Sequence, residues 1–339
     1  MIKFDAAILA EDLNSVPELA RQIEDMGFKA LWTSETSHNP FLPLPLAAYA
    51  TQQLELGTAI AVAFPRSPMV TAYIAWDLAA QSKGRFILGL GTQVKAHITR
   101  RFSTTWSSPG PRLRDYILAM RAIWEAWQNN TSLNYEGEFY KHTLMTPFFQ
   151  PSPIEHPHIP VYIAGVNEYL CRLAGELCEG FHVHPFHTVE YLRDVVIKHV
   201  SEGAEANGRS RNDVQMTCAI FVATGTNDEE IENQKVLVKS QVAFYASTPT
   251  YRAVLEHHGI GDLGERLSKM SREGRWMEMH EMISDDFLEK VCVVAPIDEL
   301  PHKVQERYEG LLDRVAYYMP YDNNPERAAM WEASLKVFA

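Results

Sequence analysis

Short apolar segments alternate with longer amphipathic segments along most of this 339-residue chain. The first apolar segment, residues 2–9, precedes a stretch in which Val16, Leu19, Ile23 and Met26 recur at helical spacing. The same alternation continues over tight connections. The apolar segments predict further strands at residues 30–35, 54–64, 85–91, 160–165, 180–186, 214–225 and 290–295.

Strands that alternate with helices indicate parallel βαβ units, which build either a closed (β/α)8 barrel or an open doubly wound sheet. Eight predicted strands in a chain of this length favour an α/β TIM barrel that forms a single domain. Residues 313–321 and 325–338 would then add an extra strand and a closing helix after the eighth strand, residues 290–295. Two long insertions, about residues 92–159 and 225–290, follow strands 4 and 7, where barrels carry catalytic loops.

The carboxyl ends of the predicted strands carry the candidate chemistry, because in a barrel these ends face the active site. Residues 84–101 run from a buried strand through two glycines into clustered basic residues, which favours an anionic ligand. This segment is not a dinucleotide-binding fingerprint, because Val94 stands where GxGxxG requires a glycine. Gly165 precedes a helix whose first N–H groups suit a phosphate. The other predicted strand ends include residues 35–38, residues 59–64, Thr224 and Ala295.

The segment GFHVHPFH supports a competing hypothesis of metal binding. His182 and His184 alternate onto one face of a strand and could hold one metal ion, as in metal-dependent barrel hydrolases. Such a site needs further ligands, and Glu35 and His38 are the only evident candidates. Neutral histidines that line a pocket are therefore favoured, and no metal is expected.

The segment FYASTPTYR lies in the second long insertion and carries aromatic and hydroxyl side chains. Two interpretations stay open for it. Tyr251 and Arg252 could contact a substrate, or the segment could pack the insertion onto the barrel.

Composition narrows the class of partner. The formal net charge of -12 argues against nucleic acid and against an anionic membrane surface. The sequence has no apolar run of about eighteen residues and no signal peptide, so a cytoplasmic location is expected. The four cysteines are scattered without a CxxC pair, which favours reduced, buried thiols over disulfides or zinc ligands.

Six segments together resemble the bacterial-luciferase-like barrel oxidoreductases, and within them the branch that uses the deazaflavin coenzyme F420. The segments are WTSE, TAIAVAFPRSP, GRFILGLGTQ, PVYIAGVN, GFHVHPF and VCVVAPIDEL. The most similar branch comprises proteins that resemble methylenetetrahydromethanopterin reductase. The resemblance implies hydride transfer between the deazaflavin and a small organic substrate, and a homodimer.

The resemblance also implies roles for individual residues. A cis peptide bond between Ala59 and Ile60 would support the cofactor ring, and Gly165, Val166 and Asn167 would receive the cofactor phosphate. The remaining cofactor contacts that we expect are Gly91, Thr92, His97, His182 and His184, with the acidic tail near Lys95, Arg100 and Arg101.

One segment departs from the family pattern. The sugar-phosphate dehydrogenases of this family read GTGE after strand 4 and use the glutamate as a proton donor, whereas Gln93 and Val94 occupy this segment here. The proton donor is then expected to be His38, Glu35 or His97, and the substrate stays open.

Three other functions stay open beside F420-dependent hydride transfer. The first is an FMN-dependent monooxygenase of the same barrel family. The second is the metal-dependent hydrolase built on His182 and His184. The third is a non-catalytic relative that binds a flavin.

Overall fold

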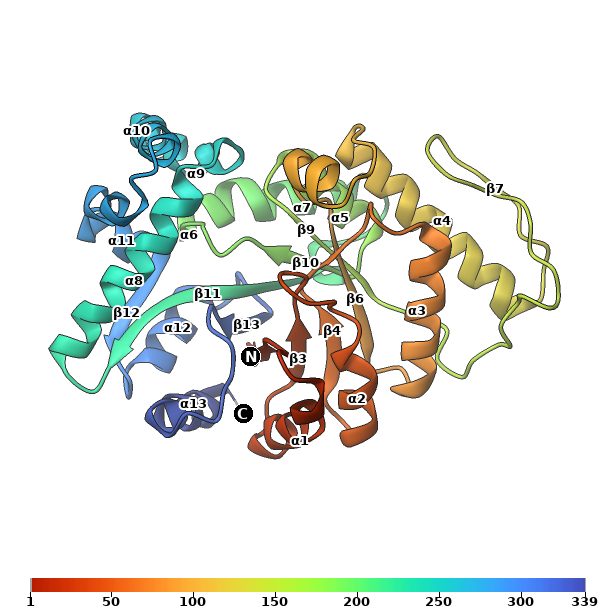
Figure 1. Ribbon diagram of the computed structural model, residues 1–339, viewed down its shortest axis with the longest axis horizontal. Helices are drawn as coiled ribbons and strands as arrows, with labels where there is room; N and C mark the ends of the chain where they lie inside the picture. Colours follow the sequence, from red (N-terminus) through yellow and green to blue (C-terminus); the bar gives the residue numbers. More distant parts are fainter. Residues whose placement is uncertain (1, 339) are drawn as a thin grey trace.

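The centre of the molecule is a parallel sheet that curves back on itself, seen in the computed structural model, which describes residues 2–338 (Figure 1). Its strands are hydrogen-bonded in the order β1-β13-β11-β10-β9-β6-β4-β3-β2. The two ends of this path, β1 (Lys3–Phe4) and β2 (Ala6–Ile8), are separated by Asp5 alone. They therefore form one strand of a nearly closed barrel, and the predicted α/β barrel is confirmed.

Helices surround this barrel and connect its strands (Figure 1). The other barrel strands are β3 (Ala30–Thr33), β4 (Glu55–Thr58), β6 (Phe86–Gly91), β9 (Val161–Gly165), β10 (Gly180–Val183), β11 (Gln215–Gly225) and β13 (Arg314–Tyr317), and the short β5 (Ala61–Val62) pairs with β6. The surrounding helices include α1 (Val16–Met26), α2 (Pro43–Ala50), α3 (Pro68–Gln81), α4 (Pro109–Asn129), α5 (Glu168–Leu177), α6 (Val189–Tyr191), η3 (Leu192–Ile197), α7 (Lys198–Glu205), α12 (Leu300–Tyr308) and α13 (Pro325–Phe338).

Sequence pattern explains the local structure of the first barrel half. All six residues of β6 are buried, which fits its continuous apolar run. Helix α1 buries Val16, Ala20 and Ile23 against the sheet. It ends at Gly27, whose φ of 99° lies in the left-handed region that glycine adopts without steric cost.

The eighth barrel strand differs from the one that the sequence pattern predicts. The strand β12 (Cys292–Pro296), predicted as the eighth, pairs with the outer half of β11, residues 221–225. The inner half of β11, residues 217–220, pairs with β13, which closes the barrel beside β1. The apolar pattern could not show whether β12 or β13 closes the barrel. Both strands pair with β11, because β11 is eleven residues long and extends well past the barrel (Figure 1).

This correction also changes two predicted strand ends. Thr224 and Ala295 face each other in the ladder between β11 and β12, beyond the part of β11 that pairs with β13. They therefore do not lie at the carboxyl-terminal opening of the barrel. Tyr318, which directly follows β13, stands at that opening instead.

The two long connections carry their own secondary structure. The connection after β6 contains the π-helical turn η2 (His97–Arg101), α4 and the hairpin of β7 (Tyr135–Glu136) and β8 (Lys141–His142), which projects from one side (Figure 1). The connection after β11 contains α8 (Asp228–Ala246), η5 (Pro249–Tyr251), α9 (Arg252–His257), α10 (Gly261–Arg272), η6 (Trp276–Met282) and α11 (Asp285–Val291).

Two further findings concern composition. Among residues 2–338, no helix combines the length and the apolar character that are needed to cross a membrane. The prediction of buried thiols is confirmed, because all four cysteines are buried and free. They are Cys171, Cys178, Cys218 and Cys292.

A buried ion-pair cluster joins the last barrel strand to the first and third. The guanidinium of Arg314 is completely buried and contacts both carboxylate oxygens of Asp5, at 2.8 and 2.9 Å, and also pairs with Glu55. The indole N–H of Trp32 donates to Asp5 at 2.9 Å. Burial opposes the charge of the guanidinium, but Asp5 and Glu55 outweigh this effect and raise the pKa of Arg314.

Replacement of Arg314 by methionine is expected to lower the free energy of unfolding by about 3–5 kcal/mol, because it leaves the Asp5 carboxylate buried without its partner. Urea unfolding followed by circular dichroism measures this change. The double variant Asp5→Asn with Arg314→Met should recover part of the loss, since it removes both charges.

The matched control is Arg21→Met, which removes an arginine from an exposed pair with Glu18 and should change stability little. An Arg314→Met protein as stable as the wild type would show that the cluster does not stabilise the barrel.

Candidate functional site

The candidate site lies at the carboxyl ends of the barrel strands, which meet at one opening because the strands are parallel. The peptide bond between Ala59 and Ile60, just after β4, is cis, as the resemblance implies. Ile60 lies against Gly91 at the end of β6, where an added Cβ would stand 2.5 Å from the Ile60 Cδ1 atom. Two residues earlier on β6, a Cβ on Gly89 would stand 1.8 Å from the carbonyl oxygen of Thr58. Glycine is therefore required for β4 and β6 to approach this closely.

Glu35, at the end of β3, is held in an ion pair that sequence analysis did not predict. Its two carboxylate oxygens each accept from Arg66 at 2.8 Å, and one also accepts from the backbone N–H of Val62 at 2.7 Å. The Glu35 side chain is only 7% exposed. This geometry makes Glu35 a positioning residue for the segment after β4. His38, three residues further along the same loop, is exposed.

The basic cluster is exposed and follows β6. Lys95, His97, Arg100 and Arg101 all present their side chains to solvent. Arg101 donates to the backbone carbonyl of Thr36 at 2.7 Å, which ties the turn η2 to the loop after β3. Within residues 2–338 no carboxylate forms an ion pair with any of these four basic side chains. Lys95, Arg100 and Arg101 are therefore cations without a carboxylate partner, gathered beside the strand ends of an acidic protein.

Residues Gly165 to Asn167 lead from β9 into α5. The Asn167 side chain caps α5 by accepting from the backbone N–H of Leu170 at 2.9 Å. A Cβ on Gly165 would stand 2.4 Å from the Leu170 Cβ atom, so glycine permits this tight turn. The first turn of any α-helix also leaves N–H groups without intrahelical partners, which suits an anion.

His182 points into the barrel and His184 lies past the end of β10. The His182 ring contacts Trp32 and Tyr162, with centroid distances of 5.1 and 5.6 Å, and its Nε2 atom has no partner among the described residues. His184 stacks on Tyr251 at 4.2 Å, and its Nδ1 atom accepts from the backbone N–H of Phe186 at 3.1 Å. Burial lowers the pKa of each of the two histidines to about 3, so both are neutral at pH 7.

Metal binding lacks a set of ligands in this arrangement. The part of the chain from residue 2 to residue 338 contains no group of three or more His, Cys, Asp or Glu side chains that could hold a metal ion. The rings of His182 and His184 contact different partners, and Glu35 is paired with Arg66. The ligands that a metal-dependent hydrolase needs are therefore not assembled among these residues.

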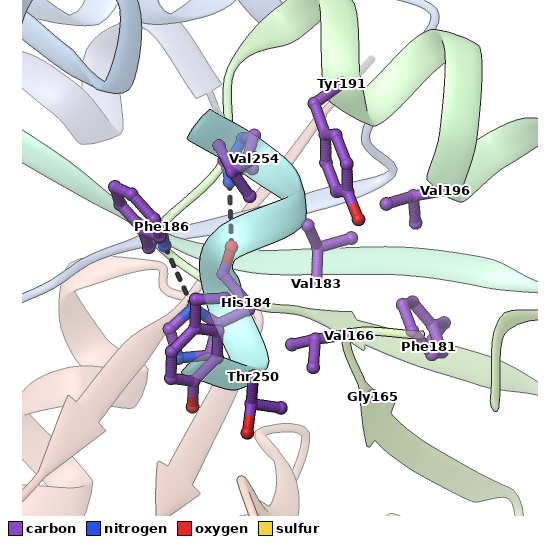
Figure 2. Close-up of a pocket in the computed structure, with 12 residues that line it drawn as sticks. Gly165, Val166, Phe181, Val183, His184, Phe186, Tyr191, Val196, Thr250 and Val254 are labelled. Carbon is purple, nitrogen blue, oxygen red and sulfur yellow. Dashed lines mark hydrogen bonds between the residues drawn. The ribbon is translucent and has the colours of Figure 1, made fainter. Parts of the chain in front are cut away.

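A small cavity of about 20 Å³ lies between β9, β10 and the second insertion, which is room for about one water molecule. Figure 2 shows Gly165 and Val166 on one side of it and His184 and Thr250 on another. Tyr251 of the insertion also lines it. This cavity brings the predicted phosphate-binding segment next to a predicted substrate residue.

The second insertion contributes tyrosines to the site. The hydroxyl of Tyr245, on α8, forms a hydrogen bond with the hydroxyl of Tyr318, directly after β13. Arg252 instead lies 3.5 Å from Glu265 of α10, within the insertion. Sequence analysis missed Tyr318 because its strand was predicted to be an extra one, although the pair of tyrosines at residues 317–318 was a signal for a strand end.

The family is established by comparison with known proteins. The luciferase-like monooxygenase model matches residues 2–314, and the chain belongs to this family. It is an oxidoreductase. An uncharacterized protein of Mycobacterium tuberculosis is 45% identical over 314 residues, which cover 93% of this chain and 92% of that protein. A putative coenzyme F420-dependent oxidoreductase of the same organism is 27% identical over 300 residues, 84% of each chain.

Solved structures support the fold. The coenzyme F420-dependent tetrahydromethanopterin reductase from Methanopyrus kandleri superposes with a TM-score of 0.79 at 21% identity and covers 98% of this chain and 97% of its own. The oxygenating constituent of 3,6-diketocamphane monooxygenase from Pseudomonas putida, in complex with FMN, gives 0.67 at 16% identity and covers 99% of this chain and 96% of its own. At these identities the likeness is one of fold.

The buried histidines predict loss of stability in mild acid. Burial lowers the pKa of His187 to about 4 from an ordinary value of 6.5, so below pH 6.5 the unfolded chain binds a proton that the folded chain excludes. The free energy of unfolding should therefore decrease as the pH is lowered below 6.5, by about 1.4 kcal/mol per pH unit for each such histidine. In His187→Gln the free energy of unfolding should decrease less between pH 6.5 and 5, because the contribution of one histidine is removed. Urea unfolding at the two pH values measures this difference.

The matched control is His302→Gln, which removes an exposed histidine and should leave the pH dependence unchanged. Equal pH dependence in the wild type and in His187→Gln would contradict the assignment of His187 as a neutral buried group.

Proposed function

We propose that the protein is an F420-dependent oxidoreductase that transfers a hydride between the deazaflavin and a small organic substrate. The observation that carries this proposal is the cluster of exposed, unpaired cations Lys95, Arg100 and Arg101 at the site of a protein with net charge -12. Such a cluster suits the acidic tail of coenzyme F420, which FMN lacks. Similarity to a putative coenzyme F420-dependent oxidoreductase supports the same choice.

The residues at the strand ends fit this cofactor. Because Gly91 has no side chain, the Ile60 side chain packs directly on its backbone, and a flat ring could lie on this surface. The turn from Gly165 to Asn167 would receive the phosphate through backbone N–H groups at the start of α5. Thr92, His182 and His184 are the further contacts that we assign to the cofactor.

The bound deazaflavin would supply the carbon that accepts or donates the hydride. The chain's own residues would bind and orient it. The ion pair of Glu35 with Arg66 fixes the backbone at Val62, which holds the segment after β4 in place. Among the three residues that we consider for proton transfer, His38 and His97 are exposed, while Glu35 is engaged with Arg66.

The cofactor is tested by thermal unfolding of the purified protein with coenzyme F420 or with FMN. A ligand at one hundred times its dissociation constant adds about 2.7 kcal/mol of stability, which gives a clear shift in melting temperature. We expect a shift with coenzyme F420. A shift with FMN alone would favour an FMN-dependent monooxygenase, for which the FMN complex of similar fold gives a precedent.

Charge reversal tests the placement of the acidic tail. The double variant Arg100→Glu with Arg101→Glu is expected to weaken coenzyme F420 binding by about tenfold, because two attractive surface interactions become repulsive. Fluorescence titration measures the affinity, and the loss should shrink at high salt because ions screen exposed charges.

The matched control is Lys269→Glu with Arg272→Glu on α10, which changes the net charge equally at two exposed positions outside the cluster. Equal affinity in the Arg100 and Arg101 variant and the wild type would remove the tail assignment.

A further inference from the structure

The hydroxyl pair of Tyr245 and Tyr318 stands where the second insertion meets the barrel. Tyr318 is fixed at the carboxyl end of the last barrel strand, because its backbone N–H donates to the carbonyl of Ile220 at 2.7 Å. Tyr245 comes from α8, and both side chains are half-buried. The Tyr245 ring packs edge-on against His184 at 4.7 Å, so the pair adjoins the end of β10.

One of the two hydroxyl hydrogens of Tyr245 and Tyr318 is not used in the bond between them. Two phenolic hydroxyls carry two hydrogens, and a bond between them uses one. Among residues 2–338, neither Tyr245 nor Tyr318 forms a second hydrogen bond through its hydroxyl. The remaining hydrogen is not donated to any group among the described residues, so an oxygen acceptor placed beside the pair could receive it.

The surroundings of the pair are aromatic and uncharged. Burial raises the pKa of Tyr245 and raises that of Tyr251 to about 12, and it lowers that of His184 to about 3. The rings in contact with Tyr245 all belong to aromatic side chains, without a carboxylate, lysine or arginine among them: His184, Phe221, Phe244, Tyr251 and Tyr318. An ionised ligand group would thus be desolvated here without a partner of opposite charge, which is costly, whereas an uncharged oxygen needs a single donor.

We propose that the hydroxyls of Tyr245 and Tyr318 bind the oxygen of an uncharged carbonyl or alcohol substrate, with His184 and Tyr251 forming an aromatic wall of the same subsite. The assignment of this ligand as a substrate rests on the proposed function. Binding at the pair does not depend on turnover and can be measured alone.

The test measures binding of acetone, 2-butanone and cyclohexanone by calorimetry, with cyclohexanecarboxylate as the charged counterpart of cyclohexanone. Oxidised coenzyme F420 is present, so no hydride donor is available and no turnover occurs. We expect at least one ketone to bind and the carboxylate to bind at least tenfold more weakly. Tyr245→Phe and Tyr318→Phe should each weaken ketone binding about three- to tenfold, and the double variant little further, because the hydroxyls act as one unit.

Tyr317→Phe is the matched control, because it removes a neighbouring buried hydroxyl that bonds to Ser334 at 2.6 Å rather than to Tyr245. It should keep wild-type ketone affinity. The melting-temperature shift with coenzyme F420 is recorded for every variant and should be retained in Tyr245→Phe and Tyr318→Phe.

Failure of the inference and failure of the proposed function are distinguishable. Ketone binding that depends on the pair, in a protein that gives no response to coenzyme F420, would keep the subsite and remove the proposed cofactor. A response to coenzyme F420 without binding of any ketone, with equal binding of the carboxylate, or with unchanged affinity in both phenylalanine variants would overturn the subsite.

Discussion

The buried contact between Arg314 and Asp5 is the constraint on which the closed barrel depends. A buried guanidinium is tolerated only where carboxylates and hydrogen bonds compensate its lost hydration. Here those carboxylates come from the first and third strands of the barrel. A shift of β13 by one residue would turn Arg314 away from Asp5, so the ion pair selects the register in which Arg314 faces Lys3.

The register fixed by Arg314 at the start of β13 also determines which way the side chains at its carboxyl end point. Successive strand residues point to opposite faces, so consecutive tyrosines have separate partners. Tyr317 is buried and its hydroxyl bonds to Ser334 of α13, while Tyr318 meets Tyr245 of the insertion. One strand therefore fastens the closing helix and also carries a side chain of the candidate site.

Sequence patterns predict the strands and helices of this fold better than they predict which strands pair and which distant side chains meet. Continuous apolar runs identified β6 and β9, and the resemblance located the cis bond at Ala59 and Ile60. The strand that closes the barrel could not be chosen from such runs, because the choice depends on the contact of Arg314 with Asp5 across 309 residues. Arg66 was missed for the same reason, since its partner Glu35 is 31 residues away. A charged residue in a sequence gives no sign that it will be buried beside a distant partner.

The long strand β11 has a consequence for how this enzyme can diversify. The insertion begins where β11 extends past the barrel and returns through β12 to the same ladder, from Phe221 opposite Cys292 to Gly225 opposite Pro296. Its two ends are thus held together by backbone hydrogen bonds, which tolerate almost any side chain. Helices between these ends can change in length and sequence during evolution while the barrel stays intact. Relatives can then acquire new substrate-facing surfaces on an inherited scaffold.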